Sequence, residues 1–274
     1  MAADTATPLF GHAVTLTATA GSANPAAGTP GGTVTFFDGT IPLGTVPLDA
    51  GQARLRIGSL QPGSHAITAA YGGDARHTPS ATAAPSDVTV GFSRPCITTA
   101  RHGALTVAAG EALCIAAGGS QTGPVTVAPG GALALSDARV TGPVSAEGAL
   151  ALTVCRSHLT GPVSVTRSTG QVLIGSDREA TACAGNTFQG PLTLEGNTGG
   201  LQASGNTITG PVRINGNSNN GTNSGSGLPG EESIPAFRAN RVTGPLRCEG
   251  NAPSLVHAGT VVQGPRSGQC RQTP

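Results

Sequence analysis

The dipeptide Gly-Pro recurs through the second half of the chain at a nearly constant interval, and this repeat restricts the folds open to the chain. Successive copies begin 19, 19, 29, 20, 34 and 20 residues apart, so the longer gaps are the same period with an insertion. The seven copies are Gly123-Pro124, Gly142-Pro143, Gly161-Pro162, Gly190-Pro191, Gly210-Pro211, Gly244-Pro245 and Gly264-Pro265. A fixed period of this length is typical of one structural unit stacked on itself. The second half of the chain is therefore predicted to be a solenoid.

Alignment on these glycines places apolar residues in three columns. The first column, two and four residues after the glycine and starting from Gly103, holds Leu105/Val107, Val125/Val127, Val144/Ala146, Val163/Val165, Leu192/Leu194, Val212/Ile214 and Leu246/Cys248. The second holds Leu113/Ile115, Leu133/Leu135, Leu152/Val154, Val172/Ile174, Leu201/Ala203 and Leu255/His257. The third holds Val140, Leu159, Phe188, Ile208, Val242 and Val262. Three inward faces per coil predict a triangular, right-handed parallel β-helix of about eight coils in residues 92–274.

Residues 1–91 have a different pattern, in which short alternating runs are separated by turn residues. Apolar and polar residues alternate over residues 14–18, 33–37, 53–57 and 65–71, which predicts half-buried strands. About seven strands in about 90 residues are typical of an immunoglobulin-like sandwich. The chain is therefore predicted to be all-β, with a sandwich domain at 1–91 and a β-helix domain at 92–274.

Two stretches resemble known families. The run from Gly32 to Asp74 resembles the bacterial Ig-like repeats of large secreted and surface proteins, especially in TFFDG, LGTVPL, GSHAIT and YGGD. In that family these modules are spacers or adhesive stalks, which the resemblance implies here. The stretch from Cys96 to Cys270 resembles a C-terminal region of secreted actinobacterial proteins that carry an Ig-like module, through CIAAGGSQTGPVTVAPGGALAL, LTVCRSHLTGPVSV, VLIGSDREATACAGNTFQGPLTLEGNTGG and SGNTITGPV. That resemblance implies a setting but no catalytic or binding residues.

The six cysteines are expected to form disulfides, because they are widely spaced and lack the close Cys-x-x-Cys pairs of metal sites. Cys155 and Cys183 fall at equivalent places in neighbouring coils, where stacked α-carbons lie within disulfide range. The other cysteines lie in the first coil and in the last two. The predicted pairs are Cys96–Cys114, Cys155–Cys183 and Cys248–Cys270, of which the outer two tie down the open ends of the β-helix.

Asparagines recur at two corners of the coils. One set is Asn186, Asn206 and Asn240, and the other is Asn197, Asn217 and Asn251. Stacked amides bond to one another and to the backbone of turns, so we interpret both sets as structural ladders rather than ligand sites.

Outward charged residues supply the candidate ligand-binding positions. Arg139 and His158 share an outward column on adjacent coils, and Asp137 is close to them. A second outward column consists of Thr126, Ser145, Ser164, Thr193, Arg213 and Arg247. Arginines of this kind bind acidic sugars or phosphate. Catalytic β-helices need carboxylates on adjacent coils at equivalent positions, and the acids here do not stack in that way, so we expect no catalytic residues, metal or cofactor.

Asp38, Asp49 and Asp74 each lie beside a turn glycine, which favours bonding to their own turn backbone over calcium binding. His65 and His77 have no partner pattern in the sequence.

Charge and hydropathy exclude two partner classes and bear on localisation. A net charge of +1 gives no field that favours nucleic acid. No run of 18 apolar residues is present, so membrane insertion is not expected. Residues 1–20 contain no export signal, and we expect a mature region cut from a longer exported precursor.

These features predict a non-enzymatic extracellular or cell-surface protein, structural or adhesive, that displays a rigid β-helix on an Ig-like spacer. The expected partners are cell-wall or extracellular glycans, or another surface protein. Two alternatives stay open: a carbohydrate-binding or carbohydrate-active β-helix, and an accessory C-terminal region of a larger secreted hydrolase. The insertions at about residues 176–185 and 218–232 are the expected places for a function specific to this chain.

Overall fold

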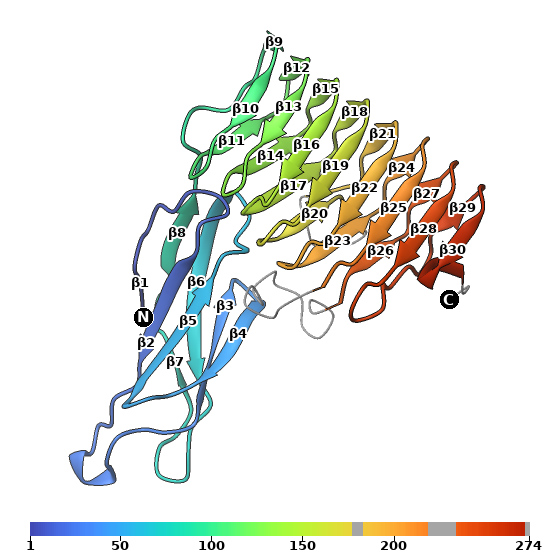
Figure 1. Ribbon diagram of the computed structural model, residues 1–274. Coiled ribbons are helices and arrows are strands. Elements are labelled where there is room, and N and C mark those ends of the chain that lie inside the picture. The colour runs from blue at the N-terminus through green and yellow to red at the C-terminus, as the bar shows by residue number, and fades with distance from the viewer. Residues whose placement is uncertain (177–182, 219–233, 272–274) are drawn as a thin grey trace. The chain divides into compact units, whose positions relative to one another are not determined.

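The computed structural model describes residues 1–176, 183–218 and 234–271, which form two compact units that divide after Gly91. The insertion residues Asp177, Arg178, Glu179, Glu231 and Glu232 lie outside this part of the chain. The first unit contains two antiparallel sheets (Figure 1). One has the order β1 (Ala2–Ala3), β2 (Val14–Thr19), β5 (Gln52–Ile57). The other has the order β4 (Ile41–Pro47), β3 (Thr33–Asp38), β6 (Gly63–Tyr71), β7 (Ser80–Ala81), and β8 (Ser86–Val90) also pairs with β6. A 3₁₀ turn, η1, covers Pro25–Ala27.

Alternation along these strands produces the core of the first unit. In β2, Val14, Leu16 and Ala18 are buried while the threonines between them are more exposed, as period-two side-chain direction requires. Phe36 from β3 and Ile67 from β6 are fully buried. The predicted all-β fold with an Ig-like unit at its N-terminus is confirmed.

His65 has two hydrogen-bond partners, which no pattern in the sequence indicates. Its Nδ1 lies 2.6 Å from Asp38 Oδ2 and its Nε2 lies 2.7 Å from the carbonyl oxygen of Gln61. Both of these oxygens only accept, so both ring nitrogens donate when the ring is an imidazolium. His77 likewise lies 2.8 Å from Asp74. The contact of His65 with Asp38 cannot be read from the sequence, because it depends on the pairing of β6 with β3.

The stability of the first unit should therefore fall as the pH rises. Burial lowers the pKa of His65, but its hydrogen bonds to Asp38 and Gln61 outweigh burial and raise the pKa above 6.5. The stabilisation is fully present below that unfolded-state value and is lost as the pH rises through the folded-state pKa. We expect a loss on the order of 1 kcal/mol.

Tyrosine fluorescence is a suitable probe, because Tyr71 is the single tyrosine, there is no tryptophan, and Tyr71 is buried in this unit. Urea unfolding of the full chain at pH 6 and at pH 9 should show the decrease, and His65→Gln should flatten it. An equal slope in both proteins would show that another group titrates.

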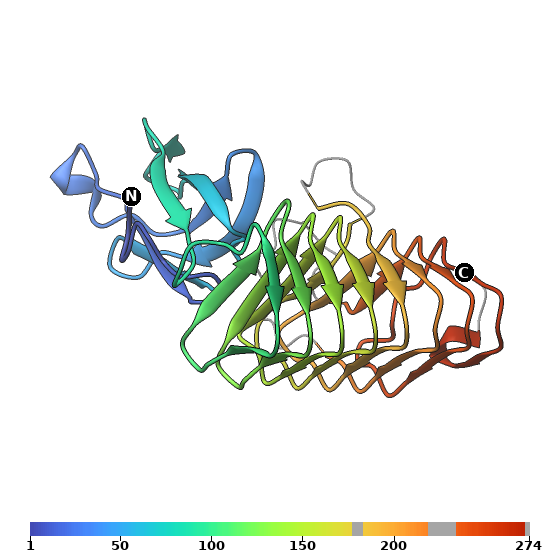
Figure 2. The same ribbon diagram turned by 90° about the horizontal axis from the view of Figure 1, so that it is seen from above.

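The second unit is a parallel β-helix of three sheets, in which each strand pairs with its equivalent one coil along (Figures 1 and 2). The first sheet is β10 (Leu105–Val107), β13 (Val125–Val127), β16 (Val144–Glu147), β19 (Val163–Thr166), β22 (Leu192–Glu195), β25 (Val212–Asn215), β28 (Leu246–Glu249) and β30 (Arg266–Gly268). The second is β11 (Ala112–Ile115), β14 (Ala132–Ser136), β17 (Ala151–Cys155), β20 (Val172–Ile174), β23 (Leu201–Ser204) and β26 (Ala236–Arg238). The third is β9 (Ala100–His102), β12 (Ser120–Thr122), β15 (Arg139–Thr141), β18 (His158–Thr160), β21 (Thr187–Gln189), β24 (Thr207–Ile208), β27 (Arg241–Val242) and β29 (Val261–Val262). A 3₁₀ turn, η2, covers Gln269–Arg271. These sheets confirm the predicted β-helix.

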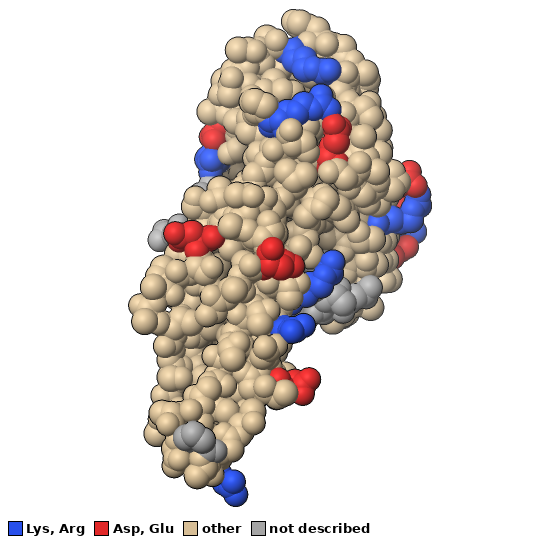
Figure 3. Space-filling view, turned by 90° about the vertical axis from the view of Figure 1, so that its left-hand side faces the viewer, with Lys and Arg blue, Asp and Glu red and all other residues tan. Residues whose placement is uncertain are grey.

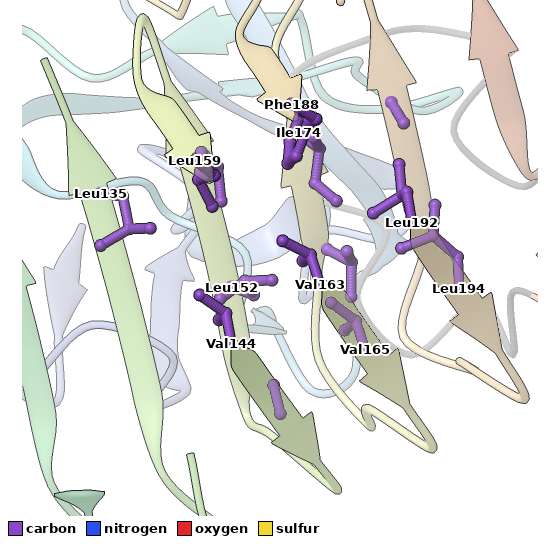
Figure 4. Packing of buried hydrophobic residues seen from close by; sticks show 14 of the residues in the cluster. Leu135, Val144, Leu152, Leu159, Val163, Val165, Ile174, Phe188, Leu192 and Leu194 are labelled. Carbon is purple, nitrogen blue, oxygen red and sulfur yellow. The ribbon is translucent and has the colours of Figure 1, made fainter. Parts of the chain in front are cut away.

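The predicted apolar columns fill the interior of the coils. Side chains from the three sheets, among them Leu152, Leu159 and Val163, lie toward one another in Figure 4 and are buried. Sequence alignment missed several members of this interior, among them Phe237 and Gln121. Phe237 of β26 is fully buried opposite Ala203 and follows the long insertion, and the polar Gln121 of β12 is buried in the third column. Gln121 is satisfied there, because its Oε1 accepts from Arg101 Nη1 at 3.1 Å.

The Gly-Pro corners stack with almost no space between coils. A Cβ added to Gly161, whose φ is 126°, would lie 2.7 Å from the carbonyl oxygen of Gly142. Only glycine accepts both this φ and this approach of backbone to backbone. The proline that follows each of these glycines is exposed, and its carbonyl accepts a ladder bond, as Pro162 does from Val144 N at 2.9 Å. The repeat in the sequence is thus the contact between successive coils.

Two hydrogen-bonded asparagine ladders run along the inside of two corners. In each ladder a side-chain amide donates both to the next asparagine and to a strand carbonyl: Asn206 Nδ2 lies 2.9 Å from Asn240 Oδ1 and 2.8 Å from Ile174 O. The predicted members are all buried. Ser157 and Thr260 continue one ladder at its ends, and Ser168 and Gln269 continue the other, which the sequence did not indicate.

Three disulfides join neighbouring coils. They are Cys96–Cys114, Cys155–Cys183 and Cys248–Cys270, with Cα–Cα distances of 4.8, 4.7 and 5.4 Å. These are the pairs that the coil positions predict. The first and third lie at the two ends of the stack, where strands have a partner on one side only.

Candidate functional site

The four candidate residues lie on two different sheets of the β-helix. Arg139 of β15 and His158 of β18 are opposite each other in the third sheet. Arg213 of β25 and Arg247 of β28 are opposite each other in the first sheet. The structure therefore brings them together as two pairs and not as one site.

Arg139 and His158 line an open cavity of about 420 Å³. Its other lining residues are Gly118, Gly119, Ser120, Asp137, Ala138 and Arg156. They come from three successive coils, at the corner that leads into the third sheet. A volume of this size is within the range of sites that hold a small organic molecule.

Asp137 is held by Arg156 and not by the predicted neighbours. Arg156 Nε lies 2.8 Å from Asp137 Oδ1 and its Nη2 lies 2.7 Å from Oδ2, a bidentate pair. Hydrogen bonds from Arg156 keep the pKa of the Asp137 carboxyl below its ordinary value, and Asp137 raises the pKa of Arg156. Sequence reasoning missed Arg156, although its position, 19 residues after Asp137, equals one coil.

The same corner carries backbone strain. Asp137 and Arg156 have φ values of 53° and 50°, where other coils have Gly118, Gly205 and Gly259. A left-handed conformation costs a non-glycine residue about 1–2 kcal/mol. Ala239 also adopts it at this corner, with a φ of 51°, so the strain alone does not mark a site.

The side chains of Arg139 and His158 have no hydrogen-bond or ion-pair partner among residues 1–176, 183–218 and 234–271. Arg139 is exposed and His158 is half-buried. Their strands are paired in register, so their α-carbons are about 4.8 Å apart. The cavity therefore presents a guanidinium and an imidazole whose donors are available.

The second pair belongs to a regular outward column of the first sheet. Strand register places Thr126, Ser145, Ser164, Thr193, Arg213 and Arg247 side by side on successive coils, as the sequence predicts. Arg247 forms an ion pair with Glu249, in which its Nη2 lies 2.8 Å from Oε2. Arg213 lies beside a like charge on the neighbouring strand. Neither Arg213 nor Arg247 lines the cavity at Arg139 and His158.

Carboxylates in the described part of the β-helix do not pair on adjacent coils. Glu147, Glu195 and Glu249 share one column, but the coils between them carry Thr166 and Asn215. Glu147 bonds to Arg167 and Glu111 bonds to Arg94. Hydrogen bonds from Arg94 and from Arg247 lower the pKa of Glu111 and of Glu249 respectively. A general acid needs a raised pKa, and the pKa values of Glu111 and Glu249 are shifted in the opposite direction.

Charge elsewhere is sparse. On the face shown in Figure 3, charged side chains lie singly or in small groups between uncharged surface. In the described ranges, no three His, Cys, Asp or Glu side chains gather closely enough to hold a metal ion. The described residues also include no helix that is long and apolar enough to span a membrane.

Comparisons with known proteins bear on the first unit. Neither the curated proteins nor the solved structures gave a match. The resemblance of the stretch from Cys96 to Cys270 to an actinobacterial region stays a prediction. One family model matches, that of the bacterial Ig-like domain (group 3), and it covers residues 1–91, the first compact unit of the chain.

Proposed function

We propose that this chain is a non-enzymatic extracellular or cell-surface protein that displays a rigid β-helix as a structural or adhesive surface beside an Ig-like spacer. The observation that carries the proposal is the way the β-helix is built. Asparagine ladders, disulfides and stacked glycine corners join its coils, and none of the acids in its described part is buried. Such an architecture adds hydrogen-bonded and buried surface with every coil. It supports a scaffold more than a catalyst.

Two features support the proposed localisation. Three disulfides favour an oxidising compartment. The family match over residues 1–91 is to a bacterial Ig-like domain, a kind of module that serves surface and extracellular structural roles. A partner is then expected among cell-wall or extracellular glycans, or other surface proteins.

A second candidate function, carbohydrate binding on the β-helix, is favoured by the cavity at Arg139 and His158. It is compatible with display, because binding needs no general acid. Catalysis has less support, because the carboxyl in that cavity, Asp137, has a lowered pKa and a bidentate partner.

The proposal is tested by scoring a panel of bacterial and plant polysaccharides for both binding and cleavage by the full chain. We expect retention of the protein on one or more polysaccharides, and no new reducing ends or unsaturated products with any of them.

A further inference from the structure

We propose that the cavity lined by Arg139, His158, Ser120 and the Asp137–Arg156 pair binds a hydroxylated carboxylate the size of a monosaccharide, such as a uronic acid residue of an acidic polysaccharide. The proposal deepens the display function above and rests on it for the source of the ligand. Its first support is charge. Asp137 neutralises the charge of Arg156 through two hydrogen bonds of 2.8 and 2.7 Å. The guanidinium of Arg139 therefore gives the cavity lining an unpaired positive charge. The cavity therefore favours an anion.

The positions of the donors select a carboxylate. Arg139 presents a planar fork of N–H groups that matches two oxygens bidentately. The imidazole of His158, one coil along, donates at least one N–H in either protonation state. Neither side chain has another partner within the described residues, so a ligand would displace only water from them.

The remaining lining suits hydroxyl groups. The hydroxyl of Ser120 both donates and accepts, and the carboxylate of Asp137 keeps lone pairs free after its bonds to Arg156. Asp137 is fixed in place, because Arg156 also donates to Ser136 Oγ at 3.0 Å. The hydroxyl groups of a sugar acid need hydrogen-bond donors and acceptors of this kind close to the position of its carboxylate.

The volume of the cavity favours a sugar acid over a small ion. The cavity of about 420 Å³ exceeds what phosphate or acetate would fill. Gly118, Gly119 and Ala138 add little side-chain volume to its walls. A Cβ on Gly119 would overlap the carbonyl oxygen of Ile97, so packing excludes a side chain there. A Cβ on Gly118 would lie 3.0 Å from the carbonyl oxygen of Thr98, which disfavours a side chain at that position. The open space is thus a consequence of the fold.

The test is calorimetric titration of the full chain with glucuronate, galacturonate, glucose, acetate and inorganic phosphate. We expect one of the uronates to bind at least about tenfold more tightly than glucose, since the carboxylate adds charge-assisted hydrogen bonds. Arg139→Ala should weaken uronate binding by about tenfold or more. Arg139→Lys should recover part of the lost affinity, because the lysine ammonium restores the positive charge but cannot bond two carboxylate oxygens as a planar guanidinium does.

A matched control is Arg241→Ala, which removes the same side chain from the same outward column, away from the cavity. It should leave uronate affinity unchanged. Far-UV circular dichroism of each variant checks that the β-helix is intact, which the exposure of both arginines favours.

Three results would overturn the proposal: no uronate binding by the unmodified chain, equal loss in the two alanine variants, or tighter binding of phosphate than of either uronate. These results leave the display function standing if the chain still adheres to polysaccharides. If the chain bound a uronate but adhered to no polysaccharide, the result would count against the display function alone.

Discussion

Replacing Gly161 by alanine should destabilise the β-helix by about 3–5 kcal/mol. The new Cβ would lie 2.7 Å from the carbonyl oxygen and 2.9 Å from the carbonyl carbon of Gly142. Both atoms are backbone of the preceding coil, so relief requires the two coils to separate. The backbone at Gly161 also has a φ of 126°, which disfavours any side chain. Guanidinium chloride unfolding followed by far-UV circular dichroism measures the loss.

Two control variants separate the clash from the conformational strain. Gly103→Ala is at the equivalent corner of the first coil, with φ 87° and no atom within 4 Å of the added Cβ. Gly196→Ala is inside the stack, with φ 64° and its nearest atom, Arg167 Cγ, at 3.6 Å. Each should cost about 1–2 kcal/mol, the strain alone. If Gly161→Ala costs no more than these two, stacking of the Gly-Pro corners does not hold the coils in register.

Replacing Asn206 by alanine should also cost about 3–5 kcal/mol. Asn206 is 1% exposed, and its side chain makes four hydrogen bonds. It accepts from the backbone N and the Nδ2 of Asn186 at 2.9 Å, and it donates to Ile174 O and Asn240 Oδ1. Alanine would leave these buried partners unsatisfied, at about 1–3 kcal/mol for each group that finds no water.

The matched control is Asn215→Ala. Asn215 is half-buried at the end of β25, and its side chain accepts one bond, from Glu249 N at 3.1 Å. Its loss should cost less than about 1 kcal/mol, because water replaces the bond. Thermal and denaturant unfolding of the two variants gives the comparison. Similar values would mean that the ladder contributes no more than any surface amide.

Much of the β-helix is predictable from the sequence, because the residues that define a coil are local and repeat. The Gly-Pro origin places the inward columns, and the columns place the asparagines and cysteines one coil apart. Phe237 escapes this alignment because the insertion between Asn217 and β26 removes the period that would locate it. Its burial depends on the register with Ala203, which is a tertiary fact.

The candidate site was predicted only in part. Arg139 and His158 follow from their outward column, but the cavity beside them depends on the corner conformation of Asp137 and Arg156. Periodicity places Asp137 close to Arg139 and His158, but it does not indicate that Arg156 is the partner of Asp137, because that depends on side-chain reach. His65 and Asp38 are a similar case, because their contact arises from the pairing of β3 with β6.

The most direct test of the central claim, a rigid surface that binds without catalysis, is the polysaccharide panel assayed for retention and cleavage together. The full chain should be retained on at least one polysaccharide and should release no product from any of them. Asp137→Asn should leave this absence of product unchanged, since no chemistry is assigned to that carboxylate. Cleavage by the unmodified chain that Asp137→Asn abolishes would contradict the account and make the cavity an active site.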